Sequence, residues 1–197
     1  MPDEKTGEKH IADVLTVNGL VIDFQHSHIN PKERESYEKF YRNMVWVVDG
    51  TRLKRDYPRF FKGQKRFLHF KEPQLKGFSL VDFPDEVFPA DWIESSVPVI
   101  FDFRGIISSI EPQDAVKNTL WCLLPKRADR YALVVCLGRE DFITTTKIRN
   151  QLLPVDEYIQ LFTDLLRPKQ RLQVKVKRRE SQYILERGHW KKRKRFY

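Results

Sequence analysis

The first fifty residues alternate between short apolar runs and sharp polar breaks. Within residues 9–27, two β-rich runs flank the pair Asn18-Gly19, which is a strong signal for a β-hairpin. The next break, Asn30-Pro31, predicts a helix start, because Asn caps helices and Pro suits the first helical position. The apolar run 45–48 then indicates a buried strand that Asp49 ends. This part of the chain therefore predicts the order strand, strand, helix, strand.

The helix that begins at Pro31 has a candidate buried stripe. Its large apolar residues recur at helical spacing, with Glu33 in the capping-box position ahead of them. We expect the stripe to consist of Tyr37, Phe40, Tyr41 and Met44.

The remainder of the chain contains both the helical spacing of apolar residues and the two-residue alternation of strands. Residues 71–98 contain four prolines and predict loops with short helical pieces. The apolar runs 99–103, 119–124 and 131–137 have strand length, and the last two suggest a hairpin. Residues 154–166 carry apolar positions at helical spacing, and 171–177 alternate strictly, with a basic outer face. The pattern predicts an α+β fold with a mixed β-sheet and flanking helices, and a second β-rich portion. We divide the chain into 1–70, a core; 71–166, a β-rich portion with a helix; and 167–197, a basic strand and tail.

Three polar residues of the N-terminal hairpin form a candidate site. Asp23 and Gln25 are two apart on one strand and therefore share a face. The length of the loop decides the face of Asp13. A two-residue Asn18-Gly19 turn pairs Asp13 with Phe24, whereas a three-residue loop over 17–19 pairs it with Asp23. Only the odd-length loop gathers the two carboxylates and the amide.

Charge is distributed unevenly along the 197 residues. The net charge is +9, but residues 167–197 alone hold 13 Lys and Arg against two acids. Concentrated positive charge favours a polyanion such as nucleic acid, and the alternative is a solubilising tail. A second basic stretch, 52–66, is interleaved with aromatic residues, which either stack on bases or face the core. The expected nucleic-acid contacts are Arg52, Lys54, Arg55, Arg59, Lys175, Lys177, Arg178, Lys191, Lys192 and Arg193.

Other classes of protein are disfavoured. No apolar run approaches the 18 residues of a membrane span, and residues 1–10 lack the apolar core of a signal peptide. Cys122 and Cys136 sit in apolar runs without metal-ligand spacing and are expected to be buried thiols. We therefore expect a cytoplasmic protein. The sequence shows no Ser/His/Asp constellation, phosphate-binding glycine loop or zinc motif.

The N-terminal unit resembles a known family. The segment HIAD ending at Asp13, the segment IDFQHS with Asp23 and Gln25, and the strand WVVD ending at Asp49 carry the resemblance. Over residues 9–50 they are similar to the competence protein CoiA-like family of the PD-(D/E)xK nuclease superfamily. The resemblance implies a nuclease-like core.

The resemblance also implies a chemistry and a partner. Asp13, Asp23 and Gln25 are the implied catalytic residues, with Asp13 and Asp23 as ligands of Mg²⁺ or Mn²⁺ for cleavage of DNA phosphodiester bonds. Gln25 would occupy the place usually held by a lysine. Nucleic acid is the expected partner, DNA before RNA. The alternative is a non-catalytic nucleic-acid-binding protein on a degenerate nuclease fold.

The superfamily core usually begins with an acidic helix and one further strand, and we expect residues 1–8 to be too few to hold either. These pieces are then either lost by truncation or supplied from elsewhere in the chain. The helix 154–166 followed by the strand 171–177 is an αβ unit of the same kind, with Glu157 as its acid. The alternative is that this unit simply completes a sheet.

Overall fold

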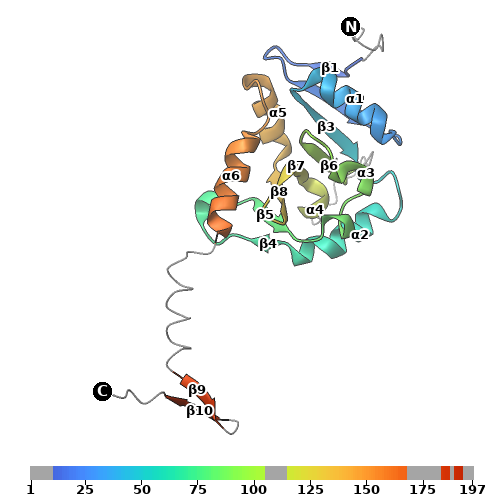
Figure 1. Cartoon of the computed structure of the whole chain (residues 1–197). Coiled ribbons are helices and arrows are strands. Elements are labelled where there is room, and N and C mark those ends of the chain that lie inside the picture. Colours follow the sequence, from blue (N-terminus) through green and yellow to red (C-terminus); the bar gives the residue numbers. More distant parts are fainter. Residues whose placement is uncertain (1–10, 105–114, 168–182, 187–188, 193–197) are drawn as a thin grey trace.

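The structure is a computed structural model that describes residues 11–104, 115–167, 183–186 and 189–192 (Figure 1). Its centre is an eight-stranded sheet in the order β1-β2-β3-β6-β7-β8-β5-β4. The strands are β1 (Val14–Leu15), β2 (Val21–Gln25), β3 (Met44–Asp49), β4 (Leu68–His69), β5 (Phe78–Val81), β6 (Val99–Asp102), β7 (Leu120–Ala128) and β8 (Tyr131–Leu137).

The sheet is mixed, as predicted. β2, β3 and β6 run parallel, and every other neighbouring pair is antiparallel. Helix α1 (Pro31–Tyr41) makes the crossover between β2 and β3, which parallel strands require. The predicted order strand, strand, helix, strand is confirmed. Strands from residues 1–70 and 71–166 join in this one sheet, because β3 pairs with β6 and β4 pairs with β5.

Helix α1 begins as its sequence predicts but buries different residues. The Asn30 side chain accepts a hydrogen bond from Lys32 N at 2.9 Å and caps the helix. The helix ends at Tyr41, so Met44 belongs to β3 and is buried there. The fully buried positions of α1 are Arg34 and Glu38. Tyr37 and Tyr41 are only partly buried against the sheet.

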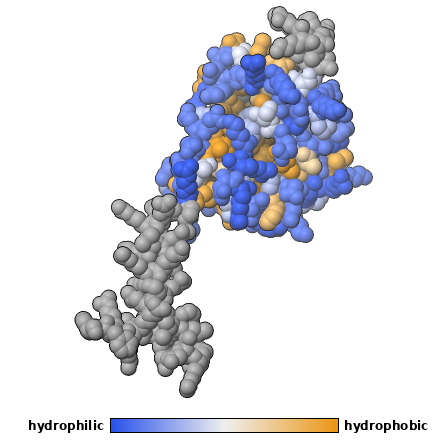
Figure 2. All heavy atoms as spheres, viewed as in Figure 1, coloured by the Kyte–Doolittle hydropathy of each residue, from blue (hydrophilic) through white to orange (hydrophobic). Residues whose placement is uncertain are grey.

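Each face of the sheet has its own core. Helices α1, α2 (Asp56–Gly63) and α3 (Ala90–Ile93) cover one face, here called the aromatic face. Its buried residues include Trp46, Phe60, Phe88, Phe101 and Trp121. Helices α5 (Arg139–Ile148) and α6 (Val155–Leu166) cover the other, the aliphatic face. Its core includes Ile22, Val45, Ile100, Leu133 and Phe162. The view in Figure 2 shows mostly hydrophilic residues on the surface, with hydrophobic ones between them.

Several predicted elements are confirmed, and several others were not expected. β7 and β8 form the predicted hairpin, although β7 runs on to Ala128 through an irregular register. The helix over 154–166 is α6. Residues 71–98 hold short 3₁₀ turns, Pro73–Leu75 and Pro84–Glu86, together with α3. Strands β4 and β5, helices α2 and α5 and the short helix α4 (Ala115–Asn118) were not predicted.

The strand predicted over 171–177 lies outside the described residues, whereas β9 (Tyr183–Glu186) and β10 (His189–Lys192) pair as a separate antiparallel ribbon. Within the part of the chain that the structure describes, no helix is both long and apolar enough to cross a bilayer.

Candidate functional site

The loop of the N-terminal hairpin has odd length. Val14 pairs with Ile22 in the β1–β2 ladder. Beyond the ladder, Thr16 N donates to Leu20 O at 2.9 Å, which leaves a three-residue loop between them. Gly19 adopts φ 80°, a conformation that favours glycine.

This register aligns the two carboxylates. Continued by one position from the Val14–Ile22 pair, it sets Asp13 opposite Asp23. A two-residue turn would have set Asp13 opposite Phe24 instead. The condition that the sequence left open is therefore met.

Asp13 also ends the ladder between β1 and β2. Its Oδ2 accepts a hydrogen bond from Phe24 N at 2.8 Å. A side-chain oxygen thus takes the place of the backbone carbonyl that would accept this hydrogen bond in a continued β-ladder. The chain preceding Asp13 turns toward α1. There the Tyr37 hydroxyl is hydrogen-bonded to the backbone of Ile11, and that of Tyr41 to the backbone of Ala12.

Asp23 is a buried acid beside other acidic groups. It is only 7% exposed and lies on the aromatic face, beneath α1. Burial, and to a smaller extent the charge of the nearby Asp13, raise the pKa of its carboxyl to about 6. The pKa values of Tyr37 and Tyr41 are also raised, first by burial and in part by the Asp23 charge. The structure therefore brings Asp13 and Asp23 close enough to repel each other.

Gln25 follows Asp23 on the same face, but its amide nitrogen turns to the end of the strand. Gln25 Nε2 donates to Ser27 O at 3.0 Å and to Ser27 Oγ at 3.1 Å. Beyond it, His26 Nδ1 lies 3.9 Å from Asp49 Oδ2. The strand end is thus a polar extension of the hairpin site.

The carboxyl ends of the parallel strands carry a second pair of acids that the sequence reasoning missed. Asp49 of β3 is in register with Asp102 of β6. Arg139 donates two hydrogen bonds to the Asp102 carboxylate, at 2.6 and 2.8 Å. Asp49 accepts from Thr51 N at 2.8 Å and from Thr51 Oγ1 at 2.6 Å. A signal was present, because each acid directly ends an apolar run, and such strand ends meet at one edge where ligands bind in open α/β sheets.

The hairpin pair suits one kind of metal. Two neighbouring carboxylates that repel each other gain from a shared divalent cation. Among the described residues, no group of three or more His, Cys, Asp or Glu side chains is arranged to hold a metal. Mg²⁺ is usually bound through one or two carboxylates, with waters and substrate phosphates completing its shell. The pair therefore fits Mg²⁺ or Mn²⁺, which need few protein ligands, better than a metal that requires a complete shell of protein ligands.

The proposed replacement for the acidic helix is not at this site. Glu157 lies on α6, which packs on the aliphatic face, whereas Asp23 belongs to the aromatic face. Glu157 is therefore not a third carboxylate beside Asp13 and Asp23. Helix α6 of the predicted αβ unit packs on the aliphatic face, and the predicted strand 171–177 lies outside the described residues.

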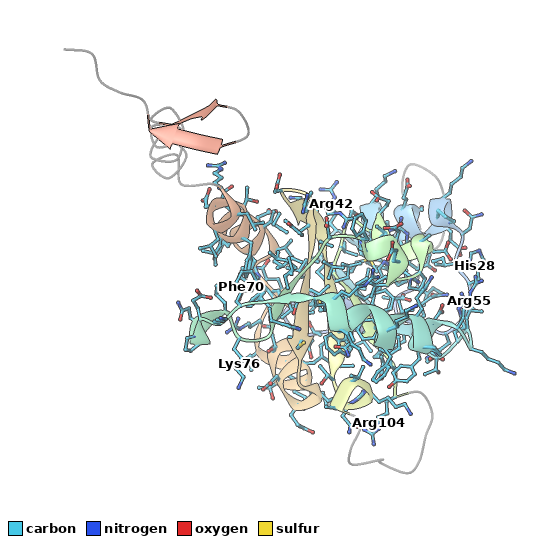
Figure 3. All side chains as sticks on the ribbon, turned by 90° about the horizontal axis from the view of Figure 1, so that it is seen from below. His28, Arg42, Arg55, Phe70, Lys76 and Arg104 are labelled. Carbon is cyan, nitrogen blue, oxygen red and sulfur yellow. The ribbon has the colours of Figure 1, made fainter. Side chains whose placement is uncertain are left out.

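The basic stretch 52–66 divides into structural and accessible residues. Phe60 is fully buried, as the core interpretation predicts, whereas Phe61 is 40% exposed and lies under Lys65 Nζ at 4.7 Å from its ring centre. Arg59 is held by Asp56 at 3.2 Å. Lys54 and Arg55 are exposed, Arg52 is half-buried, and Figure 3 shows Arg55 at one end of α2.

The remaining predicted contacts lie in the C-terminal part. Lys191 and Lys192 belong to β10. Lys175, Lys177, Arg178 and Arg193 lie outside the described residues.

Comparison with protein-family models, with curated proteins and with solved structures finds no match to this chain. The features of this chain that bear on function are therefore the geometry of the hairpin, the neighbouring strand ends and α2.

Proposed function

We propose that this protein is a metal-dependent nuclease or nuclease-like protein acting on DNA, with Asp13 and Asp23 as ligands of Mg²⁺ or Mn²⁺. The observation that supports this most is the odd hairpin register, which sets the two carboxylates opposite each other. The raised pKa of Asp23, about 6, is the electrostatic consequence of burial and of that proximity. Raised carboxyl pKa values of this kind are frequent at functional sites.

When bound, the metal would polarise a phosphate and lower the pKa of an attacking water. The chain's own residues would hold the two carboxylates in place and position the phosphate. Phe24 N fixes one oxygen of Asp13, and α1 holds Asp23 away from bulk water. Gln25 would orient water or phosphate, although a neutral amide lacks the charge that lysine gives to a transition state. Lys54 and Arg55, both exposed, would neutralise backbone phosphates.

A non-catalytic DNA-binding protein is the second candidate. The observation that favours it is the position of Gln25, whose amide nitrogen is engaged by Ser27. A site with two acids and a neutral amide in the place of the lysine would bind a metal and a phosphate without efficient cleavage. This candidate predicts steep salt dependence of binding and no products.

The test is incubation of the full chain with single- and double-stranded DNA and RNA, in Mg²⁺, Mn²⁺ or EDTA. Asp13→Asn and Asp23→Asn remove the ligand charges while keeping side-chain shape. Asp164→Asn, an exposed acid on α6, is the matched control. Cleavage that EDTA and both hairpin variants abolish, but the control retains, supports the nuclease. DNA binding without products in any metal supports the second candidate, and absence of both binding and cleavage overturns both.

A further inference from the structure

A cavity of about 270 Å³ lies at the sheet edge opposite the hairpin. Strands β4, β5 and β8 and the end of α2 form its walls. The residues that give it chemical character are Arg66, Phe67, Asp82, Phe83, Arg130 and Tyr131. The proposed hairpin site uses none of them.

The cavity presents aromatic surface to solvent. Phe67 is buried in its wall, whereas Phe83 is 58% exposed, a large fraction for a phenylalanine. The Arg130 guanidinium carbon lies 4.8 Å from the centre of the Tyr131 ring, and Arg130 donates to the Tyr131 hydroxyl at 2.8 Å. Arginine planes and aromatic rings are the surfaces on which proteins stack unpaired bases.

The rim of the cavity carries balanced charge. Arg130 Nε lies 3.3 Å from Asp82, and Arg66 Nη2 lies 2.7 Å from Glu86. Exposed ion pairs of this kind contribute little free energy, so a ligand can exchange with either partner. Such a rim offers donors and acceptors to a polar ring edge, and it does not favour a small anion.

We propose that this cavity binds a single unstacked nucleobase of the nucleic acid on which the protein acts, an inference that rests on the proposed function for its partner class. The apolar walls would hold the faces of the ring. Arg130 and Asp82 would supply a donor and an acceptor for its polar edge. A base paired within a duplex cannot enter such a cavity, so the site selects single-stranded or locally opened DNA.

The position of the cavity fits a strand that also reaches the hairpin. Phe67 and Val81 of the cavity wall belong to the aromatic face, as does Asp23. Five strand spacings separate β2 from β5, which is about 24 Å at ~4.8 Å per strand. A stacked single strand would cover that distance in about seven nucleotides, at ~3.4 Å each. Seen from below in Figure 3, α2 crosses the sheet from Arg55 toward the strands near Phe70.

The test measures binding of fluorescent single-stranded oligonucleotides of 4 to 14 nucleotides by anisotropy, in EDTA to prevent cleavage. Phe83→Ala and Arg130→Ala should each weaken binding of the longer oligonucleotides about tenfold, as removal of a stacking surface does elsewhere. Leu165→Ala on α6, with 53% exposure, is the matched control and should bind as wild type does. Thermal unfolding verifies that each variant is folded.

The outcomes separate the two proposals. An oligonucleotide with one abasic position, moved along the strand, should lose affinity at one position in wild type and at none in Phe83→Ala. If wild type binds DNA but both cavity variants bind equally well, the nucleobase site is wrong and the proposed function stands. If wild type binds no single-stranded oligonucleotide but cleaves duplex DNA with Mg²⁺ or Mn²⁺, the nucleobase site is wrong and the proposed function again stands. Absence of both binding and cleavage overturns both proposals.

Discussion

Two buried carboxylates near α1 have opposite surroundings. Glu38 and Asp23 are 3% and 7% exposed, so both have left bulk water. Glu38 accepts hydrogen bonds from Arg34 Nη1, Trp46 Nε1, Ser95 Oγ, Ser96 N and Ser96 Oγ, at distances of 2.7 to 3.2 Å. Asp23 instead has the Asp13 carboxylate nearby and a pKa raised to about 6.

The difference separates a structural acid from a candidate functional one. The charge of Glu38 is satisfied within the fold, where it ties α1 to the loop before β6. The ionised form of Asp23 is destabilised by its surroundings, and a cation from outside the chain would offset this. Burial alone does not distinguish the two residues; their partners do.

Removal of Glu38 should have the largest effect. Glu38→Ala leaves the buried Arg34 guanidinium without its carboxylate, and such changes cost about 3–5 kcal/mol of stability. Urea unfolding measures this. Glu35→Ala is the control, because Glu35 pairs with Lys39 at the same spacing on the same helix but in solvent, where about 0.5 kcal/mol is expected. If Glu38→Ala and Glu35→Ala lost the same stability, the buried partners of Glu38 would not stabilise the fold, and Glu38 would no longer differ from Asp23 as a structural acid.

Replacement of Asp23 should act in the opposite direction. Its folded pKa of about 6 exceeds the ordinary 3.8, so the folded state binds the proton more tightly. Wild-type stability from this group is fully present below pH ~3.8 and is lost as the pH rises through about 6. Asp23→Asn imitates the protonated form and should stabilise the metal-free protein at pH 7 by about 1–3 kcal/mol. Unfolding curves from pH 4 to 8 in EDTA would contradict this if the variant were less stable at pH 7.

Metal addition should have an intermediate effect. Mg²⁺ at ten times its dissociation constant should stabilise wild type by about 1.4 kcal/mol. The gain should vanish in Asp23→Asn and shrink at pH 5, where a proton competes for the carboxylate. Thermal unfolding with Mg²⁺, Mn²⁺ and EDTA measures it. Equal stabilisation of Asp164→Asn and Asp23→Asn would place the metal elsewhere.

The smallest effect is expected for the basic residues near α2, of which one is paired within the fold and another is exposed. Arg59 is engaged by the buried Asp56, whereas Lys54 is exposed. Lys54→Gln should lower the slope of log affinity for single-stranded DNA against log salt by about 0.7. Its stability should change by less than about 0.5 kcal/mol. Arg59→Gln should instead reduce stability, and an unchanged salt slope in Lys54→Gln would remove Lys54 from the interface.

The order of N-terminal elements was predictable because local signals set it. Asn18-Gly19 marks the hairpin, and Asn30 caps α1 as expected. The loop length was not predictable from this pair. It depends on Thr16, whose Oγ1 accepts from Leu20 N at 3.0 Å and helps to close a three-residue loop.

Long-range contacts explain the other differences. Arg34 and Glu38 have the spacing of an ordinary exposed helical pair. Hydrogen bonds to Glu38 from Trp46, Ser95 and Ser96, all outside the helix, distinguish it from such a pair. Helix α5 contains the run Thr144–146, whose β-branched residues disfavour helices. Phe142 of α5 packs against the aliphatic core, and this long-range contact favours the helix despite the three threonines.

The hydrogen bond from Phe24 N to Asp13 gives the hairpin a spectroscopic reporter. Most strand amides donate to neutral carbonyls, whereas this amide donates to a carboxylate beside Asp23. Its proton chemical shift is therefore coupled to the charge on Asp13, and so to anything that shares that charge. A single backbone resonance can follow proton and cation occupancy of the pair in solution, without a substrate and without any turnover.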